Sequence, residues 1–158
     1  MAYTVFRCDD MPGVDQRTLI KSVLVVDGDG APIAAENGSI VVIGDLVEGQ
    51  HDLYKATLAT ADADVKKCAV LGTPELEYDE CHYHNLDEFT NKAGKPATAY
   101  LLREGGSFGV TAEGFTAAPE AGATVALAAN GKIAAGTGLG SVLAIENAGR
   151  YTYYVIKL

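Results

Sequence analysis

A short stretch of the chain gathers several residue types that bind metals. Residues 80–88 have the sequence E-C-H-Y-H-N-L-D-E and hold His82, His84 and Glu88. On a β-strand, residues two apart point to the same side, so both imidazoles can face one ion. Imidazole and carboxylate groups bind Zn, Fe, Mn and Ni in proteins. The spacing H-x-H-x-x-x-E therefore makes these three residues candidate metal ligands.

This pattern resembles the first metal motif of the cupins, which are small β-barrels, and implies a metal-dependent enzyme. The resemblance runs from His82 to Gly94. Leu76 stands where the motif has a glycine, and no histidine follows His84, so His51 would have to supply the ligand of the second motif. The alternative is a solvated acidic loop that carries imidazoles. We favour that alternative and expect no metal, no cofactor and no catalytic residue.

The three cysteines also favour structure over catalysis. Cys81 adjoins His82, but neighbours on a strand point apart, so adjacency does not create a thiolate–imidazolium pair. Cys8 and Cys68 are expected to be small buried apolar groups. The odd number of cysteines and the lack of C-x-x-C spacing indicate reduced thiols made in a cytoplasm.

Two glycine-rich runs are predicted to be turns. Residues 136–140, G-T-G-L-G, lack the spacing and the strand–helix context of a dinucleotide loop, so we expect a hairpin connector. Residues 27–30, D-G-D-G, lack the later glutamate of a calcium loop and are predicted to be a solvated turn.

Composition and charge exclude several classes of partner. The 158 residues carry a net charge of −9. Nucleic-acid binding needs clustered Lys and Arg, so neither nucleic acid nor an anionic membrane surface is expected as a partner. No stretch is apolar for long enough to span a membrane, and residues 1–4 do not begin a secretory signal peptide.

The hydrophobic pattern predicts strands separated by glycine turns. Asn130-Gly131 lies between two apolar runs and predicts a type I′ hairpin, because both residues tolerate positive φ. A second hairpin is expected near the end of the chain. A helical turn is expected only within 85–92. The expected strands cover residues 17–26, 39–43, 51–58, 68–71, 75–79, 97–103, 107–111, 124–129, 132–135, 141–146 and 150–158.

These elements predict an all-β fold, either an antiparallel β-sandwich or a small β-barrel with short hairpins and little helix. Residues 17–158 are expected to form one β-rich domain, with a possible division into lobes near residue 95, where the composition changes. Residues 1–16 are either the first strand of that domain or an arm that adds a strand to a neighbour's sheet.

Four segments resemble the head decoration (cement) proteins of tailed bacteriophages. They are G-D-L-V-E-G-Q-H-D-L-Y-K-A-T (44–57), P-E-L-E-Y-D-E (74–80), N-L-D-E-F-T-N-K-A-G-K-P-A-T-A-Y (85–100) and G-R-Y-T-Y-Y-V-I-K-L (149–158). They cover about a third of the chain and contain no catalytic signature. The resemblance implies a β-rich, non-catalytic virion protein that binds the major capsid protein on the outside of the assembled shell. It also implies a homotrimer.

Two alternatives to a decoration protein remain open from the sequence. A tail-tube or head–tail connector subunit is also small and β-rich but forms a ring. A cupin-like metal-dependent enzyme would use His82, His84 and Glu88. Native mass separates a trimer from a ring, and metal content separates the enzyme from both.

Overall fold

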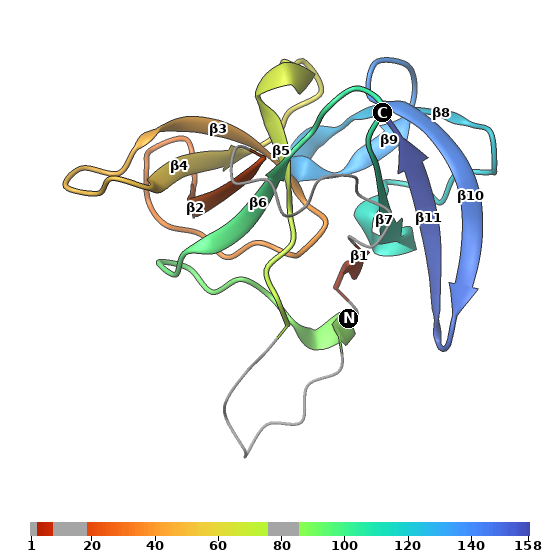
Figure 1. Ribbon diagram of the computed structural model, residues 1–158, viewed down its shortest axis with the longest axis horizontal. Coiled ribbons are helices and arrows are strands. Elements are labelled where there is room, and N and C mark those ends of the chain that lie inside the picture. Colours follow the sequence, from red (N-terminus) through yellow and green to blue (C-terminus); the bar gives the residue numbers. More distant parts are fainter. Residues whose placement is uncertain (1–2, 8–18, 76–85) are drawn as a thin grey trace.

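A computed structural model describes residues 3–7, 19–75 and 86–158 of the chain. Strands form two sheets, and the helical content is limited to turns of three residues, so the predicted all-β fold is confirmed. The sheets lie side by side, with the barrel on the left of Figure 1 and the open sheet on the right. The short 3-10 turns are η1 (Val65–Lys67), η2 (Leu86–Glu88), η3 (Ala112–Gly114) and η4 (Ala129–Gly131).

The first sheet is a closed five-stranded barrel with the order β2-β4-β3-β5-β6. Small residues such as Val23, Val41 and Ala99 fill its interior and are fully buried, because a barrel of so few strands leaves little room inside. The β2–β4 pair is parallel, and the other pairs are antiparallel. The barrel strands are β2 (Ile20–Val26), β3 (Ile40–Leu46), β4 (Leu53–Leu58), β5 (Cys68–Leu71) and β6 (Ala97–Leu101).

The second sheet has six strands in the order β1-β7-β11-β10-β8-β9, and all its pairs are antiparallel. Its strands come from the second half of the chain, except for the short first strand. They are β1 (Phe6–Arg7), β7 (Ser107–Thr111), β8 (Thr124–Leu127), β9 (Ile133–Ala135), β10 (Gly140–Ala148) and β11 (Tyr151–Lys157).

Both hairpins predicted in the second half are confirmed. β8 pairs with β9 across a loop that contains Asn130 and Gly131, whose φ angles of 57° and 68° are both positive as predicted. The loop has three residues, 129–131, because Ala128 bonds to Lys132, so it is longer than the predicted two-residue type I′ loop. β10 pairs with β11 as the last hairpin. Residues 136–139 connect β9 to β10, and Leu139 within them is buried. The hairpin connector predicted at 136–140 is wrong, because β8 lies between β9 and β10 in the sheet.

The main core lies between the barrel and the six-stranded sheet. Successive side chains of β3 point to opposite sides of the barrel wall. Val41 therefore points into the barrel, while Ile40 points out of it. Ile40 and Val70 are paired across β3 and β5 and pack in one cluster with Phe108 and Ile156 of the other sheet. One apolar core therefore joins the two sheets.

The start of the chain belongs to this chain's own sheet. Phe6 pairs with Val110 and Arg7 with Gly109, so residues 6–7 form an edge strand beside β7. The ring of Phe6 stacks on Tyr100 at 5.8 Å between centroids. Residues 1–2 and 8–16 of the predicted arm lie outside the described residues.

The strand expected at 75–79 is not seen at Glu75, and the rest of it lies outside the described residues. The expected strand at 17–26 begins at Ile20, and that at 97–103 ends at Leu101. No helix in the described ranges reaches the length and apolarity needed to cross a membrane.

Candidate functional site

The predicted metal site is only partly visible. His82 and His84 lie outside the described residues, whereas Glu88 ends η2 and is exposed. His51 lies in the turn between β3 and β4, which projects from a different side of the molecule than η2 (Figure 1). The fold therefore does not bring His51 to Glu88. The described ranges hold no group of three or more His, Cys, Asp or Glu residues placed to bind a metal.

The described end of the acidic stretch makes structural contacts. One carboxylate oxygen of Asp87 accepts from Arg150 at 2.7 Å, and the other accepts from the Tyr151 hydroxyl at 3.1 Å. The backbone oxygen of Asp87 accepts from the Tyr3 amide at 2.8 Å. Burial has the largest effect on the pKa of Tyr151 and raises it, and the hydrogen bond to Asp87 raises it further. Asp87 thus joins η2 to the tip of the β10–β11 hairpin and to the start of the chain.

Cys68 is a core residue, as predicted. It is fully buried at the start of β5, and burial raises the pKa of its thiol to about 11. Its Sγ donates to the backbone oxygen of Asp64 at 3.3 Å. A thiol with this pKa stays protonated near neutral pH, so it is a poor nucleophile. Cys8 and Cys81 lie outside the described residues.

A charged cluster that the sequence did not predict joins three parts of the fold. Oε2 of Glu36 accepts from Lys132 Nζ at 2.9 Å and from the Thr4 hydroxyl and amide at 2.8 and 3.2 Å. Burial by itself would raise the pKa of Glu36, but these hydrogen bonds and the Lys132 charge hold it below its usual value. Lys132 also donates to the backbone oxygen of Glu113 at 2.9 Å. Every polar group here has a structural partner.

Two buried asparagines form a second network that the sequence did not predict. Nδ2 of Asn91 donates to Oδ1 of Asn37 at 3.0 Å and to the Ala35 carbonyl at 3.1 Å. Asn37 in turn donates to the Thr73 carbonyl at 2.7 Å and accepts from the Thr73 amide at 3.1 Å. The network holds three loops together at one end of the barrel.

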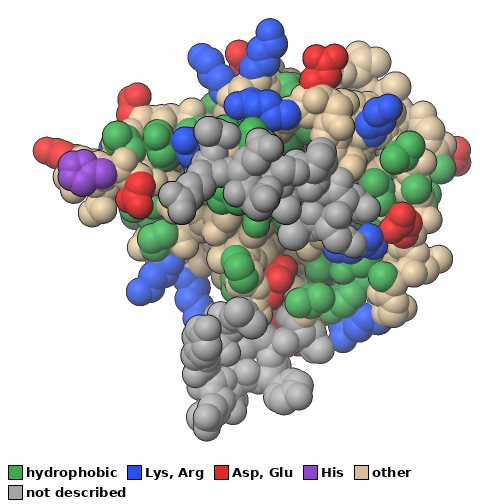
Figure 2. All heavy atoms as spheres, in the orientation of Figure 1, with side chains coloured by type: hydrophobic (Ala, Val, Ile, Leu, Met, Phe, Trp, Pro, Cys, Tyr) green, Lys and Arg blue, Asp and Glu red, His purple; other side chains and the backbone are tan. Residues whose placement is uncertain are grey.

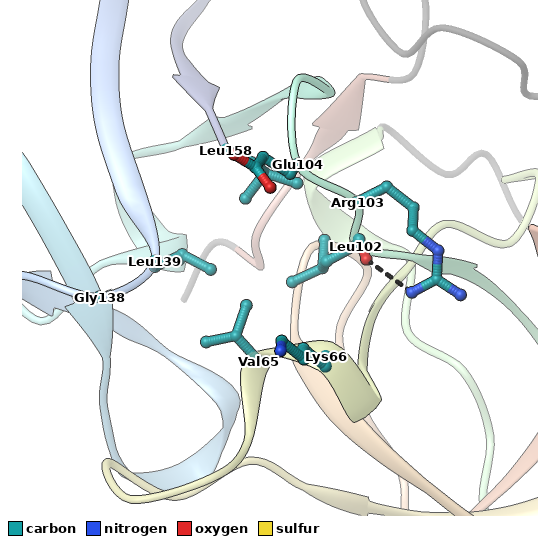
Figure 3. Close-up of a pocket in the computed structure, with 8 residues that line it drawn as sticks. All are labelled: Val65, Lys66, Leu102, Arg103, Glu104, Gly138, Leu139 and Leu158. Atoms are coloured by element: carbon teal, nitrogen blue, oxygen red, sulfur yellow. Dashed lines mark hydrogen bonds between the residues drawn. The ribbon is translucent and has the colours of Figure 1, made fainter.

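A cavity of about 400 Å³ opens where η1 approaches the connections of the second sheet. Figure 3 shows Val65, Leu102, Leu139 and Leu158 around one space, while the guanidinium of Arg103 turns away from it. Arg103 Nη1 donates to the Leu102 carbonyl at 3.1 Å. The walls are mainly aliphatic, so the cavity suits an apolar group rather than acid–base chemistry.

The most exposed apolar feature is one edge of β10. This strand pairs with β11 from Ser141 to Ala148, but it pairs with β8 only at Gly140 and Ser141. Residues 143–148 therefore form a free sheet edge among the described strands; we call this segment the β10 edge. It is the lower half of the outermost arrow on the right of Figure 1.

Large apolar side chains lie along the β10 edge. Leu143 is 63% exposed, the highest value among the large apolar side chains described, and Ile145 is 41% exposed. A register shift between Val142 and Ala144 leaves Leu143 without a partner on β11, which explains its exposure. Figure 2 shows apolar side chains among a few charged ones on the side where Figure 1 draws β10 and β11.

The β10 edge was predicted as a strand but not as an edge. Its sequence V-L-A-I-E-N-A, residues 142–148, gives no sign of which side lacks a neighbour. Comparisons of the chain with protein-family models, with curated proteins and with solved structures found no match.

Proposed function

We propose that this chain is a non-catalytic structural protein that works by covering area on a larger assembly. The assembly is the head of a tailed bacteriophage. The chain binds the outer surface of the assembled shell through the major capsid protein, and it also contacts other copies of itself. In the infected cell it is made in the bacterial cytoplasm and ends on the outside of the virion.

The observation that supports this proposal is the exposed apolar edge of β10 on an acidic molecule. Contiguous exposed apolar groups mark interaction sites, and an unpaired sheet edge offers hydrogen-bonding groups to another chain. Leu143 and Ile145 supply the apolar groups. The net charge of −9 keeps such a protein soluble before it binds and suits the outer face of a shell more than the inner face, where DNA repels it.

The mechanism is stabilisation by mass action. A protein that binds only the assembled shell adds its binding free energy to that state, about 2.7 kcal/mol per site when the free protein is at a hundredfold excess over Kd. Many identical sites on one lattice add avidity. This mechanism needs no cofactor and no partner besides the capsid protein and the chain itself.

The experiment mixes the purified chain with assembled, empty shells of the major capsid protein encoded in the same genome. We expect the chain to sediment with assembled shells but not with free coat subunits, and to raise the temperature at which the shells break. Equal binding to free subunits, or no binding, would contradict the proposal. A stable ring of about six copies in native mass measurements would instead support a tail-tube or connector subunit.

A further inference from the structure

The β10 edge directs backbone hydrogen-bonding groups toward solvent. The amide of Leu158 donates to the Gly106 oxygen at 2.9 Å, on the β7 side of the sheet. Backbone groups alternate in direction along a strand, so those of Tyr154 also point toward β7. Ile145 lies opposite Tyr154 in the β10–β11 register. The amide and carbonyl of Ile145 therefore point away from β11.

The same register gives the same direction at two further positions. Asn147 lies opposite Thr152, which is two residues from Tyr154, so its backbone groups also point outward. Val142 lies opposite Ile156 and confirms the pattern, because its amide and carbonyl bond to the loop at 122–123 and not to β11. Val142 has these partners, whereas no backbone partner of Ile145 or Asn147 lies outside β11 among the described residues.

The segment of the chain that contains the β10 edge carries no net charge. Residues 121–149 contain a single lysine, Lys132, and a single glutamate, Glu146, so the net charge of −9 lies entirely elsewhere. Both of these charges are also paired within the molecule, Lys132 with Glu36 at 2.9 Å and Glu146 with Arg7 at 3.0 Å. Two β10 edges can therefore approach each other without like charges of their own segments meeting.

The other open edges of the described strands are short. β1 offers two residues, and β9 offers three, of which Ile133 already accepts from the Thr116 amide at 2.8 Å. The barrel is closed, and the end of β3 that extends past β5, residues 43–46, is interrupted by an irregularity in its pairing with β4 and carries Asp45. Among the described strands, the β10 edge is therefore the longest open edge that a second copy of this chain presents.

We propose that two copies of the chain associate by antiparallel pairing of their β10 edges around a two-fold axis, which joins the two six-stranded sheets. Identical strands that pair side by side satisfy the same groups on both partners, as a two-fold interface requires. The outward amides and carbonyls of Ile145 and Asn147 bond across the axis, and Leu143 and Ile145 become buried. This contact differs from the trimer that the resemblance to decoration proteins implies.

The expected dimer is transient in dilute solution. The edge contributes six residues from each copy, whereas a standard interface uses roughly 20–30 residues on each side. The contact is expected to persist where copies are held close together, since a high local concentration offsets a low affinity.

The test compares two variants with equal changes in charge and nearly equal exposure. Ile145→Glu places like charges across the proposed axis. Leu46→Glu is the matched control, because Leu46 is 43% exposed at the end of β3 in the barrel. Sedimentation equilibrium of the purified chain over a wide range of concentrations measures the mass. We expect the native chain and Leu46→Glu to approach twice the monomer mass at high concentration, and Ile145→Glu to remain a monomer.

A second measurement keeps the result independent of any folding defect. In the native chain, amide exchange at Ile145 and Asn147 is expected to slow as the concentration rises, while exchange at barrel amides stays unchanged. A native chain that is monomeric at every concentration, or that forms trimers without protecting these amides, would overturn the inference. So would equal association of Ile145→Glu and Leu46→Glu. The inference concerns the contact between copies alone, so a dimer that fails to bind shells would overturn only the proposed function.

Discussion

At the scale of single residues, Glu36 makes an ionic contact that is expected to contribute to stability. Its carboxylate is about three-quarters shielded from solvent and accepts hydrogen bonds from Lys132 and from two groups of Thr4. These residues come from the start of the chain, the loop before β3 and the turn before β9. A single carboxylate thus links both sheets.

The Glu36 contact predicts a dependence of stability on pH. The pKa of Glu36 is lower in the folded state than its ordinary value of 4.5. Its contribution is therefore complete above that value and is lost as the pH falls through the lower, folded-state pKa. We expect the melting temperature to drop in this acidic range. In Glu36→Gln that part of the drop is expected to be missing, as measured by circular dichroism.

Replacing Glu36 also tests the size of its contribution. Glu36→Gln is expected to cost about 1–3 kcal/mol at neutral pH, because hydrogen bonds from Lys132 and Thr4 lose a charged acceptor. Glu146→Gln is the control, since the Glu146–Arg7 pair is more exposed and is expected to contribute at most about 1 kcal/mol. Urea unfolding measures both. Equal losses in the free energy of unfolding would show that the Glu36 contact contributes no more than an exposed ion pair.

The imidazoles of the acidic stretch carry a separate prediction. We expect purified protein to hold no stoichiometric Zn, Fe, Mn or Ni by elemental analysis, and to stay folded in chelator. His82→Ala combined with His84→Ala is expected to leave shell binding unchanged. A bound metal that the double variant loses would favour the cupin-like alternative over a structural protein.

At the scale of elements, the β8–β9 hairpin depends on Gly131. Its φ is +68°, and a Cβ there would lie 2.6 Å from the Ile40 carbonyl oxygen. The hairpin turn therefore sits directly against the backbone of β3. Two separate physical effects, conformation and close approach, require glycine here.

A pair of substitutions separates these two effects. Gly49 has a similar φ of +76°, but nothing lies within 4 Å of the position of its Cβ. We expect Gly49→Ala to cost about 1 kcal/mol from conformation alone. Gly131→Ala is expected to cost about 2–4 kcal/mol, because crowding adds to conformation. Unfolding in urea measures both, and similar values would mean that the backbone contact has no energetic weight.

At the scale of the whole molecule, the two sheets share one core. Phe108 of β7 is fully buried in the cluster that also holds Ile40 and Val70 of the barrel. If one sheet unfolds, the apolar side chains that the other sheet contributes to this cluster become exposed to water. The two sheets are therefore expected to unfold together.

A substitution in the shared core tests this coupling. Phe108→Ala is expected to cost about 3–5 kcal/mol through lost burial and a cavity. Far-ultraviolet circular dichroism and tyrosine fluorescence should then show a single shifted transition. Leu143→Ala, at an exposed position, is expected to change stability by less than about 0.5 kcal/mol. Two separate transitions in the Phe108 variant would show that the sheets unfold independently.

The sequence alone determined the class of fold and most of its strands. Alternation of apolar residues and turn signals such as Asn130-Gly131 are local, because they follow from the pleat of a strand and from allowed φ angles. Cys68 in a short apolar run was correctly predicted to be buried. These features need no knowledge of distant residues.

Only the tertiary structure decided how the strands pair and which groups meet. The parallel β2–β4 pair, the closure of the barrel and the contact of Glu36 with Lys132 join residues far apart in the chain, and no local pattern encodes them. The free side of β10 is another feature that no local pattern encodes. A strand's sequence sets which residues face the core, but whether its edge has a neighbour depends on where every other strand lies.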